Sequence, residues 1–281
     1  MTKLFALTLA AFSSAACAQM PATNPMPDGS RDMYVGLGVV SAPRYEGGRD
    51  RETSALPVLQ VQWSNGLFVS GMRAGLHLSR VPGLEWGPLL ELQPRRDVDG
   101  AGGAVDGIGE MRIGLVALPL AATNGNRLAG MPVIERRLLG GAFLNYYLTP
   151  DWRVTGSLLY GAGNARDGMK FDIGVQRLAL EVGPHHRLAF DAALGFASRR
   201  YNMAFFGVSE SDSFNSGNAV FEAGGGLKDL RLGARWNWAW SPAWMLTTSA
   251  QATHLLGSAR SSPLVERPTN LTVSTAIAYR F

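Results

Sequence analysis

The chain has 281 residues, enough for one large domain or two ordinary ones, and no stretch resembles a linker between two. Its formal net charge is +4 at neutral pH, and the arginines are spread along the chain without a basic block that would indicate nucleic-acid binding. No run of about 18 apolar residues exists, which excludes a helical membrane protein. The 34 glycines and the frequent aromatic residues favour many short strands over long helices.

The first 30 residues predict an export signal followed by a flexible lead-in. Lys3 provides the positive start, Leu4–Phe12 the short apolar core, and Ala16-Cys17-Ala18 a small-residue cleavage site between Ala18 and Gln19. An acylated Cys17, as in a lipoprotein, is the second interpretation, because Ser14 stands where such signals usually carry Leu. Removal of the signal would take away Cys17, the single cysteine, and Lys3. We therefore predict a signal peptide over 1–18, a periplasmic lead-in over 19–30 and one domain over 31–281.

The N-terminal half of this domain predicts strands of uneven clarity. Met33 to Val39 alternate between apolar and small residues, and Leu59, Val61 and Trp63 mark the next strand. A hairpin turn at 64–66 follows, since Asn-Gly tolerates the positive φ that such turns need. We expect a single strand over 68–79. The segments 84–96 and 108–121 alternate weakly, with a glycine-rich turn over 99–109 between them.

The C-terminal half alternates more regularly. Strands are predicted over 138–148, 152–160, 171–182, 188–196, 230–240 and 244–252, and the slip of the apolar phase in 171–182 indicates a β-bulge near Gln176 and Arg177. The polar segment 201–226 is expected to be a long loop. The last strand, 271–281, alternates strictly, and its Ile277, Tyr279 and Phe281 form the expected C-terminal barrel-assembly signal.

These strands indicate a membrane barrel. They have about 10 to 14 residues each, which is what a tilted strand needs to cross a bilayer. Short turns alternate with long loops, as periplasmic turns and outer loops do in outer-membrane barrels. Aromatic residues at the short-turn ends predict a girdle there: Trp63, Tyr146, Trp152, Trp240, Trp244 and Phe281.

The predicted fold class is therefore all-β: a transmembrane, antiparallel, up-and-down β-barrel in the outer membrane. We expect about twelve strands if both weak segments are strands and ten if neither is, because bacterial barrels use even numbers. A soluble β-sandwich is the alternative.

The polar faces of the strands would point into the lumen. They carry eight arginines with three aspartates as partners: Arg73, Arg137, Arg153, Arg187, Arg199, Arg231, Arg235 and Arg280, with Asp172, Asp191 and Asp229. Arg187, Asp191, Arg231 and Arg235 are the principal candidate lumen charges. Two interpretations follow, a lumen that favours anions and a plugged interior whose charges pair with one another.

One enzyme-like set of residues is present. His77 and Ser79 share a side of a predicted strand, and Glu91 on a neighbouring strand could orient the histidine, as in an acyl-transfer site or in outer-membrane lipid A deacylases. Yet these side chains would face the lumen, away from a lipid substrate. His185 and His186 adjoin in a predicted turn, where neighbouring side chains diverge and disfavour a shared metal. No residue is assigned a catalytic, cofactor-binding or metal-binding role, and we expect no enzyme.

Several short segments together resemble the MltA-interacting protein (MipA/OmpV) family. They are Tyr34-Val-Gly-Leu-Gly-Val-Val, Pro43-Arg-Tyr-Glu-Gly-Gly, Phe205-Phe206-Gly207-Val208-Ser209, Gly226-Leu-Lys-Asp229, Ser262-Pro-Leu-Val265 and Tyr279-Arg-Phe281. The likeness spans nearly the whole mature chain, and only 98–132 matches poorly. The most distinctive loop positions are Tyr45, Gly47, Phe206, Gly207 and Val208.

The resemblance implies an outer-membrane barrel in contact with the lipid bilayer. The family's named member bridges a lytic transglycosylase, a murein hydrolase, and a penicillin-binding protein, a murein synthase, so the implied role is a non-enzymatic scaffold in envelope remodelling. A porin-like channel or a surface adhesin or receptor is the alternative, and a lipid A-modifying esterase is a remote one. No cofactor and no nucleic-acid partner are expected.

Overall fold

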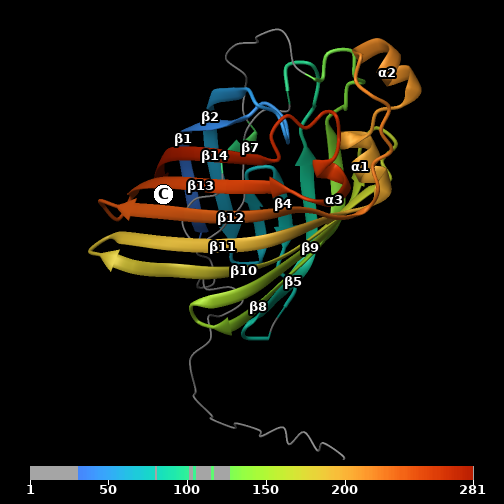
Figure 1. Ribbon diagram of the computed structural model, residues 1–281. Coiled ribbons are helices and arrows are strands. Elements are labelled where there is room, and N and C mark those ends of the chain that lie inside the picture. Colours follow the sequence, from blue (N-terminus) through green and yellow to red (C-terminus); the bar gives the residue numbers. More distant parts are fainter. Residues whose placement is uncertain (1–30, 80, 101–103, 106–114, 117–126, 281) are drawn as a thin grey trace, which may run out of the picture.

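Twelve antiparallel strands close into one barrel in the computed structural model, which describes residues 31–79, 81–100, 104–105, 115–116 and 127–280 (Figure 1). The strands are β1 (Arg31–Pro43), β2 (Arg51–Trp63), β3 (Leu67–Ser70), β4 (Arg73–Leu76), β5 (Leu84–Gln93), β8 (Arg137–Thr149), β9 (Trp152–Ala162), β10 (Gly168–Gly183), β11 (His186–Ala197), β12 (Gly226–Ala239), β13 (Trp244–Leu255) and β14 (Thr269–Arg280). The predicted fold class is confirmed. The predicted signal peptide and lead-in lie outside the described residues.

The last strand closes the barrel against the first. Residues Tyr34 to Ser41 of β1 pair with Arg280 to Val273 of β14, so no strand edge is left between the two ends of the domain. This closure explains how a strictly alternating apolar strand can end the chain without exposing an edge that invites aggregation.

The outer face of the wall is apolar, whereas the inner face mixes apolar with polar and charged side chains. Leu37 and Leu138 are 73% and 63% exposed, and similar side chains follow along every long strand, whereas their neighbours in sequence point inward and are largely buried. A band of exposed apolar residues around a closed barrel is the surface that lipid covers. Tyr146, Trp152, Trp240 and Trp244 are 40% to 50% exposed at the short-turn end, where the girdle was expected; Phe281 lies outside the described residues.

The predicted single strand over 68–79 was wrong. The chain reverses at Gly71 and Met72, so that Ser70 pairs with Arg73 and two strands of four residues, β3 and β4, form a hairpin in the wall. Gly71 adopts φ +61°, a left-handed conformation that glycine reaches at little cost. The apolar phase is interrupted at Ser70, and this interruption marks the turn.

The strand count of about twelve is confirmed, but its membership differs from the expectation. Segment 84–96 does supply a wall strand, β5, which pairs directly with β8. Of segment 108–121 only Leu115 and Val116 are described. They form β7, which pairs with β6 (Ala104–Val105) in a separate two-stranded sheet against β1, β2 and β14. The β3–β4 hairpin, and not 108–121, supplies the twelfth strand.

Two further local predictions can be compared with the structure. The bulge expected near Gln176 and Arg177 is confirmed, since the β10–β11 register shifts between Arg177 and Leu180. The loop expected over 201–226 contains helices instead: α1 (Arg199–Phe206) and α2 (Glu210–Ser216), each with a serine at its N-cap. A third short helix, α3 (Gly257–Arg260), lies in the β13–β14 loop.

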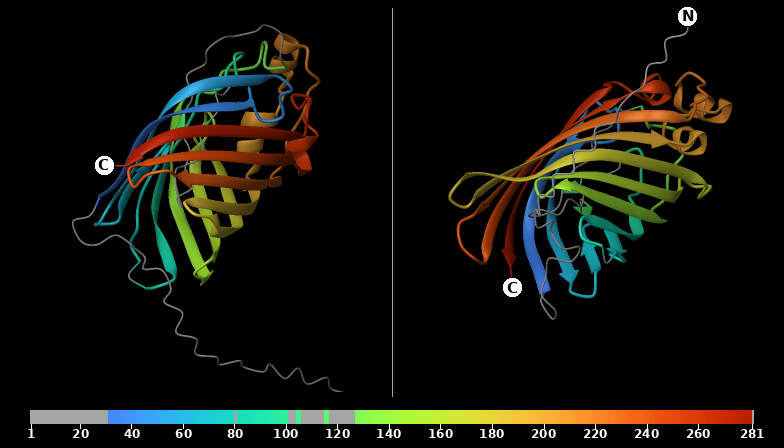
Figure 2. Two further views of the ribbon diagram at one scale, coloured as in Figure 1. Left: turned by 90° about the vertical axis from the view of Figure 1, so that its left-hand side faces the viewer. Right: turned by 90° about the horizontal axis from the view of Figure 1, so that it is seen from below.

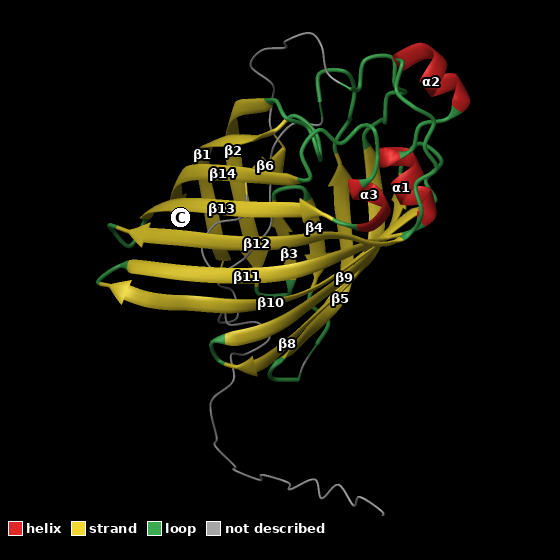
Figure 3. Cartoon of the chain, viewed as in Figure 1, coloured by secondary structure: helices red, strands yellow, loops and turns green. Residues whose placement is uncertain are grey.

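The two ends of the barrel are unlike each other. Helices and long loops gather at one end, and the tight turns lie at the other, as Figures 2 and 3 show. Within the described residues no helix is long and apolar enough to cross a membrane. By the usual asymmetry of outer-membrane barrels, the helical end is the outer end and the short turns face the periplasm.

Candidate functional site

The five motif residues of the resemblance meet at the outer end. Buried Tyr45 packs with Leu128, Val208 and Leu264, and its hydroxyl donates to the Leu264 carbonyl over 3.1 Å and to Glu266 over 3.3 Å. Burial, reinforced by Glu266, raises the pKa of Tyr45 above its ordinary value. The β1–β2 loop is thereby tied to the β13–β14 loop.

The glycines in these motifs allow close backbone contacts. Gly47 has φ +91°, and its carbonyl accepts from the amides of Glu266 and Arg267. Gly207 ends α1, and a Cβ there would lie 2.5 Å from the Met203 carbonyl oxygen. The carbonyl of Phe206, which is 1% exposed, accepts from the Ser262 hydroxyl over 2.6 Å. Loops far apart in sequence thus form one outer cap, which we define as residues 44–50, 94–100, 127–134, 198–225 and 256–268.

Arg96 joins the loop after β5 to this cap. It is 5% exposed, donates to the Phe205 carbonyl over 2.5 Å and to the Ala204 carbonyl over 3.4 Å, and lies over the Phe205 ring. Its guanidinium therefore satisfies carbonyls at the C-terminal end of α1, which have no partner within the helix. Burial lowers the pKa of Arg96 to about 10.

A buried charge cluster underlies the cap. Lys228 is 6% exposed; its ammonium lies 2.9 Å from Glu46, 2.8 Å from Asp229, and over the ring of Tyr201. Burial raises the pKa of Tyr201. Arg231 continues the cluster inward, since it pairs with Asp229 over 3.0 Å and with Asp172. Because each charge has an opposite partner, the cluster holds the cap to the wall instead of attracting a free ion.

Two more networks bridge strands inside the lumen. Glu91 of β5 pairs with Arg73 of β4 over 2.5 Å and with Lys170 of β10. Glu85 accepts from Tyr147 over 2.8 Å and from Asn145 over 2.9 Å. Arg153 completes this second network through the Tyr147 hydroxyl, Gln176 and, at 3.8 Å, Glu85. The described lumen therefore agrees with the interpretation of a self-paired interior.

The candidate lumen charges occupy different places. Arg231 lies in the cluster under the cap, and Arg235 is 4% exposed on the inner face of β12. Asp191 and Arg187 line the cavity described below, Arg187 near the short-turn end with Glu181 at 3.3 Å. Arg199 was wrongly expected to face the lumen: it begins α1 and pairs with Glu222 on the surface.

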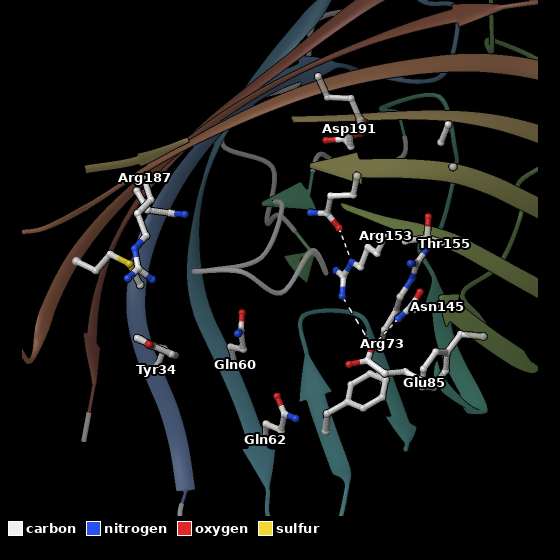
Figure 4. A pocket seen from close by; sticks show the side chains of 18 of the residues that line it. Tyr34, Gln60, Gln62, Arg73, Glu85, Asn145, Arg153, Thr155, Arg187 and Asp191 are labelled. Atoms are coloured by element: carbon white, nitrogen blue, oxygen red, sulfur yellow. Dashed lines mark hydrogen bonds and ion pairs between the residues drawn. The ribbon is translucent and has the colours of Figure 1, made fainter. Parts of the chain in front are cut away.

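A cavity of about 1450 Å³ lies inside the barrel, in the half nearer the short turns. Its lining includes Glu91 and Arg231 at mid-height and the turns at 183–187 and 240–245 at the short-turn end. Figure 4 shows Gln60 and Gln62 projecting into it from β2, across from Arg153 and Thr155. This lining includes no described residue of the outer cap and reaches the short turns, so the pocket lies toward the periplasmic side.

The enzyme-like set is not assembled. The β4–β5 register places Glu91 opposite Arg73, four residues before His77, and its carboxylate is held by Arg73 and Lys170. Ser79 bonds locally with Val81, while His77 packs between the rings of Phe68 and Phe143. Without contact among the three groups the set offers no acyl-transfer site. Among the described residues there is also no cluster of His, Cys, Asp or Glu that could hold a metal.

Sequence reasoning missed Glu85, Lys170 and Lys228 as charges that organise the interior, and it gave Glu91 another role, as a partner of His77. Glu85, Glu91, Lys170 and Lys228 are anions and cations at inward positions of strands, and each has a cross-strand or loop partner. The alternation pattern identifies which charged residues face inward, but it does not identify the residue with which each one forms an ion pair. Arg96 lies in a loop without periodicity, and no sequence signal marks it.

Residues 35–281 match the sequence model of the family described as MltA-interacting protein MipA. The chain belongs to the MipA family. The match includes the Tyr45–Gly47 and Phe206–Val208 segments that the cap brings together. No curated protein matches the chain closely enough to add a relative.

Solved structures resemble this MipA-family chain only distantly. The NanC porin has 8% identity and a TM-score of 0.38 over 90% of this chain and all (100%) of its own. The toluene transporter TodX of Pseudomonas putida has 12% identity and a TM-score of 0.36 over 95% of this chain and 93% of its own. Likenesses this weak carry no argument about function. The family and the closed strand wall identify an outer-membrane barrel protein.

Proposed function

We propose that this MipA-family barrel is a non-conducting scaffold of the Gram-negative outer membrane that works at its periplasmic rim. The partners would be a murein hydrolase of the lytic transglycosylase class and a murein synthase of the penicillin-binding class. The observation that carries the proposal is the asymmetry of the barrel: at the outer end the loops are tied to one another and to the wall by the cap contacts and the charge cluster, while the cavity lining reaches the short turns at the other end. The family's description names MltA as an interacting protein, which supports a partner on that side.

The periplasmic rim has a raised side suited to contact with a protein. β10 and β12 have 16 and 14 residues, more than the 9–11 that span a bilayer, and their hairpins extend furthest at that end (Figure 1). The β10–β11 hairpin presents His185, and the β12–β13 hairpin presents Ser241 and Pro242. Aromatic rings from His186 through Trp236, Trp238, Trp240 and Trp244 to Tyr279 stack beneath these tips and fix them.

The test is capture of envelope enzymes by the folded mature protein with a rim variant. His185→Gly with Arg187→Ser removes two rim side chains; His185 has φ +67°, so glycine there is tolerated, and the ion pair of Arg187 with Glu181 is half-exposed. We expect capture of a lytic transglycosylase and a penicillin-binding protein by the wild type. The variant should lose about 5-fold or more, which corresponds to the roughly 1 kcal/mol or more that a hot-spot side chain contributes to an interface.

The matched control changes the other end of the barrel. Arg199→Ser removes an equally exposed ion pair, with Glu222, from the outer cap. It should leave capture unchanged. Equal capture by all three proteins would reject the rim as the docking surface, and absence of both enzymes from the wild-type capture would reject the scaffold.

A second candidate function, surface attachment, rests on one observation at the opposite end. Phe214 on α2 is 92% exposed at the outer end, where an apolar ring has no lipid to cover it. If this helix is adhesive, cells that carry the Phe214→Ser protein should attach to a host surface less than cells that carry the wild type. Unchanged attachment would remove this candidate.

A further inference from the structure

The cavity in the periplasmic half of the barrel is larger than a typical small-molecule site. Its volume of about 1450 Å³ exceeds the usual 300–1,000 Å³ of such pockets. Its lining follows the strand wall from mid-height to the periplasmic turns, which place its opening at that end. A ligand that fills it would therefore be extended and would enter from the periplasm.

The charges that line the cavity are already compensated. Arg73 is paired with Glu91, Arg153 with Glu85, and Arg231 with Asp172. An anionic ligand such as a phosphate or a lipid headgroup would have to break these pairs, because charge recognition needs uncommitted arginine or lysine donors. The lining is therefore matched to an uncharged ligand.

Uncommitted polar groups remain between these pairs. Within the described part of the chain, the side chains of Gln62, Thr155 and Gln251 line the cavity without making a hydrogen bond. They supply two amides and a hydroxyl, each able both to donate and to accept. The rings of Tyr34 and Tyr147 are also part of the lining. Such a lining of aromatic faces and a few amides fits a ligand rich in hydroxyl and amide groups.

A peptide fits less well than a sugar chain. Extended peptides usually add to an exposed strand edge, where the main chain provides the affinity. Beside the cavity the strands are paired, β1 with β14 along their length and Gln60–Gln62 of β2 with Phe68–Ser70 of β3. Recognition there must come from side chains alone.

We infer that the cavity is a periplasm-facing binding pocket for an uncharged oligosaccharide, held by Gln62, Thr155 and Gln251. The inference goes beyond the scaffold role and does not depend on it, because it rests on the cavity lining and not on the rim. A barrel that docks no enzyme would still bind the sugar, and a barrel that docks enzymes without binding sugar would refute only this inference.

The test is calorimetric titration of the detergent-folded mature protein with a tetramer of N-acetylglucosamine. A length-matched galacturonic acid tetramer serves as the anionic probe and a tetra-alanine peptide as the peptide probe. We expect saturable binding of the N-acetylglucosamine tetramer and weaker or no binding of the other two. Gln62→Leu and Thr155→Val should each weaken it by about 2- to 10-fold, the effect of one lost hydrogen bond.

A matched control separates loss of the site from loss of the fold. Thr275→Val makes the same change on the lipid face, where Thr275 is exposed and bonds only with Thr248. It should bind as the wild type does, and all variants should unfold at the same urea concentration. The inference is overturned by no saturable binding, by tighter binding of the acidic or peptide probe, or by equal affinity in the lumen variants and the control.

Discussion

Lys228 is the residue on which the attachment of the outer cap depends most. Its ammonium is shared by Glu46 on the β1–β2 loop and Asp229 on β12, and it is almost fully buried. Removing one partner of a buried pair leaves a charge without compensation, which costs more than the pair contributed when intact.

The first prediction concerns this lysine. Lys228→Met should lower the free energy of unfolding by about 3–5 kcal/mol, measured by urea denaturation of the vesicle-folded protein. Arg200→Met is the control, because Arg200 pairs with Asp167 while 73% of its side chain is exposed, and such pairs contribute about 0–1 kcal/mol. Equal losses in the two variants would show that the Lys228 cluster does not hold the cap.

The second prediction concerns the buried tyrosines of the cap, Tyr45 and Tyr201. Burial raises the pKa of each above the ordinary 10.0, so the folded protein keeps protons that the unfolded chain releases. The stability from this difference is complete below pH 10 and is lost as pH rises from 10 toward the folded pKa.

The measurement is the urea midpoint at about pH 8 and about pH 11 for the wild type and for Tyr45→Phe with Tyr201→Phe. The wild type should lose more stability between the two values than the double variant does. An equal loss would mean that these hydroxyls do not govern the alkaline instability.

Among the elements, the β3–β4 hairpin carries the third prediction. Gly71→Ala should destabilise the barrel by about 1–2 kcal/mol, because a Cβ at φ +61° disfavours the turn. The substitution should also weaken the hydrogen bond that the residue 71 amide donates to the Leu59 carbonyl. Gly140→Ala is the matched control: Gly140 lies on the lipid-facing side of β8, and a Cβ there meets nothing within 4 Å. A Gly71→Ala barrel as stable as the control would contradict the strained turn.

The long strands could be predicted from sequence, and the short elements could not. In β1, β8, β12 and β14 lipid covers one face along the whole strand, so the alternation is long enough to be recognised. β3 and β4 have four residues each, which is too short for a period to distinguish one strand from two. The helix α2 is polar, and α1 has only eight residues, too few for an apolar period to mark a helix within the loop.

At the scale of the whole molecule, the residues that face the lumen could be predicted, but the contacts that join distant strands and loops could not. Alternation placed Arg73, Arg153 and Arg231 inside, yet their partners come from strands or loops far away in the chain, as Asp172 does for Arg231. Tyr45, Phe206 and Val208 were recognised as a recurring set of loop residues, but only the fold shows that they meet in one cap.

The central claim is that the barrel is closed at its outer end and works on the periplasmic side. The most direct measurement is single-molecule conductance of the folded mature protein in planar bilayers, with Lys228→Met and Arg96→Ala combined as a variant whose cap is released from the wall. The account predicts no stable conductance steps in the wild type and brief openings in the variant. Steady, porin-like conductance at every wild-type insertion would contradict the account.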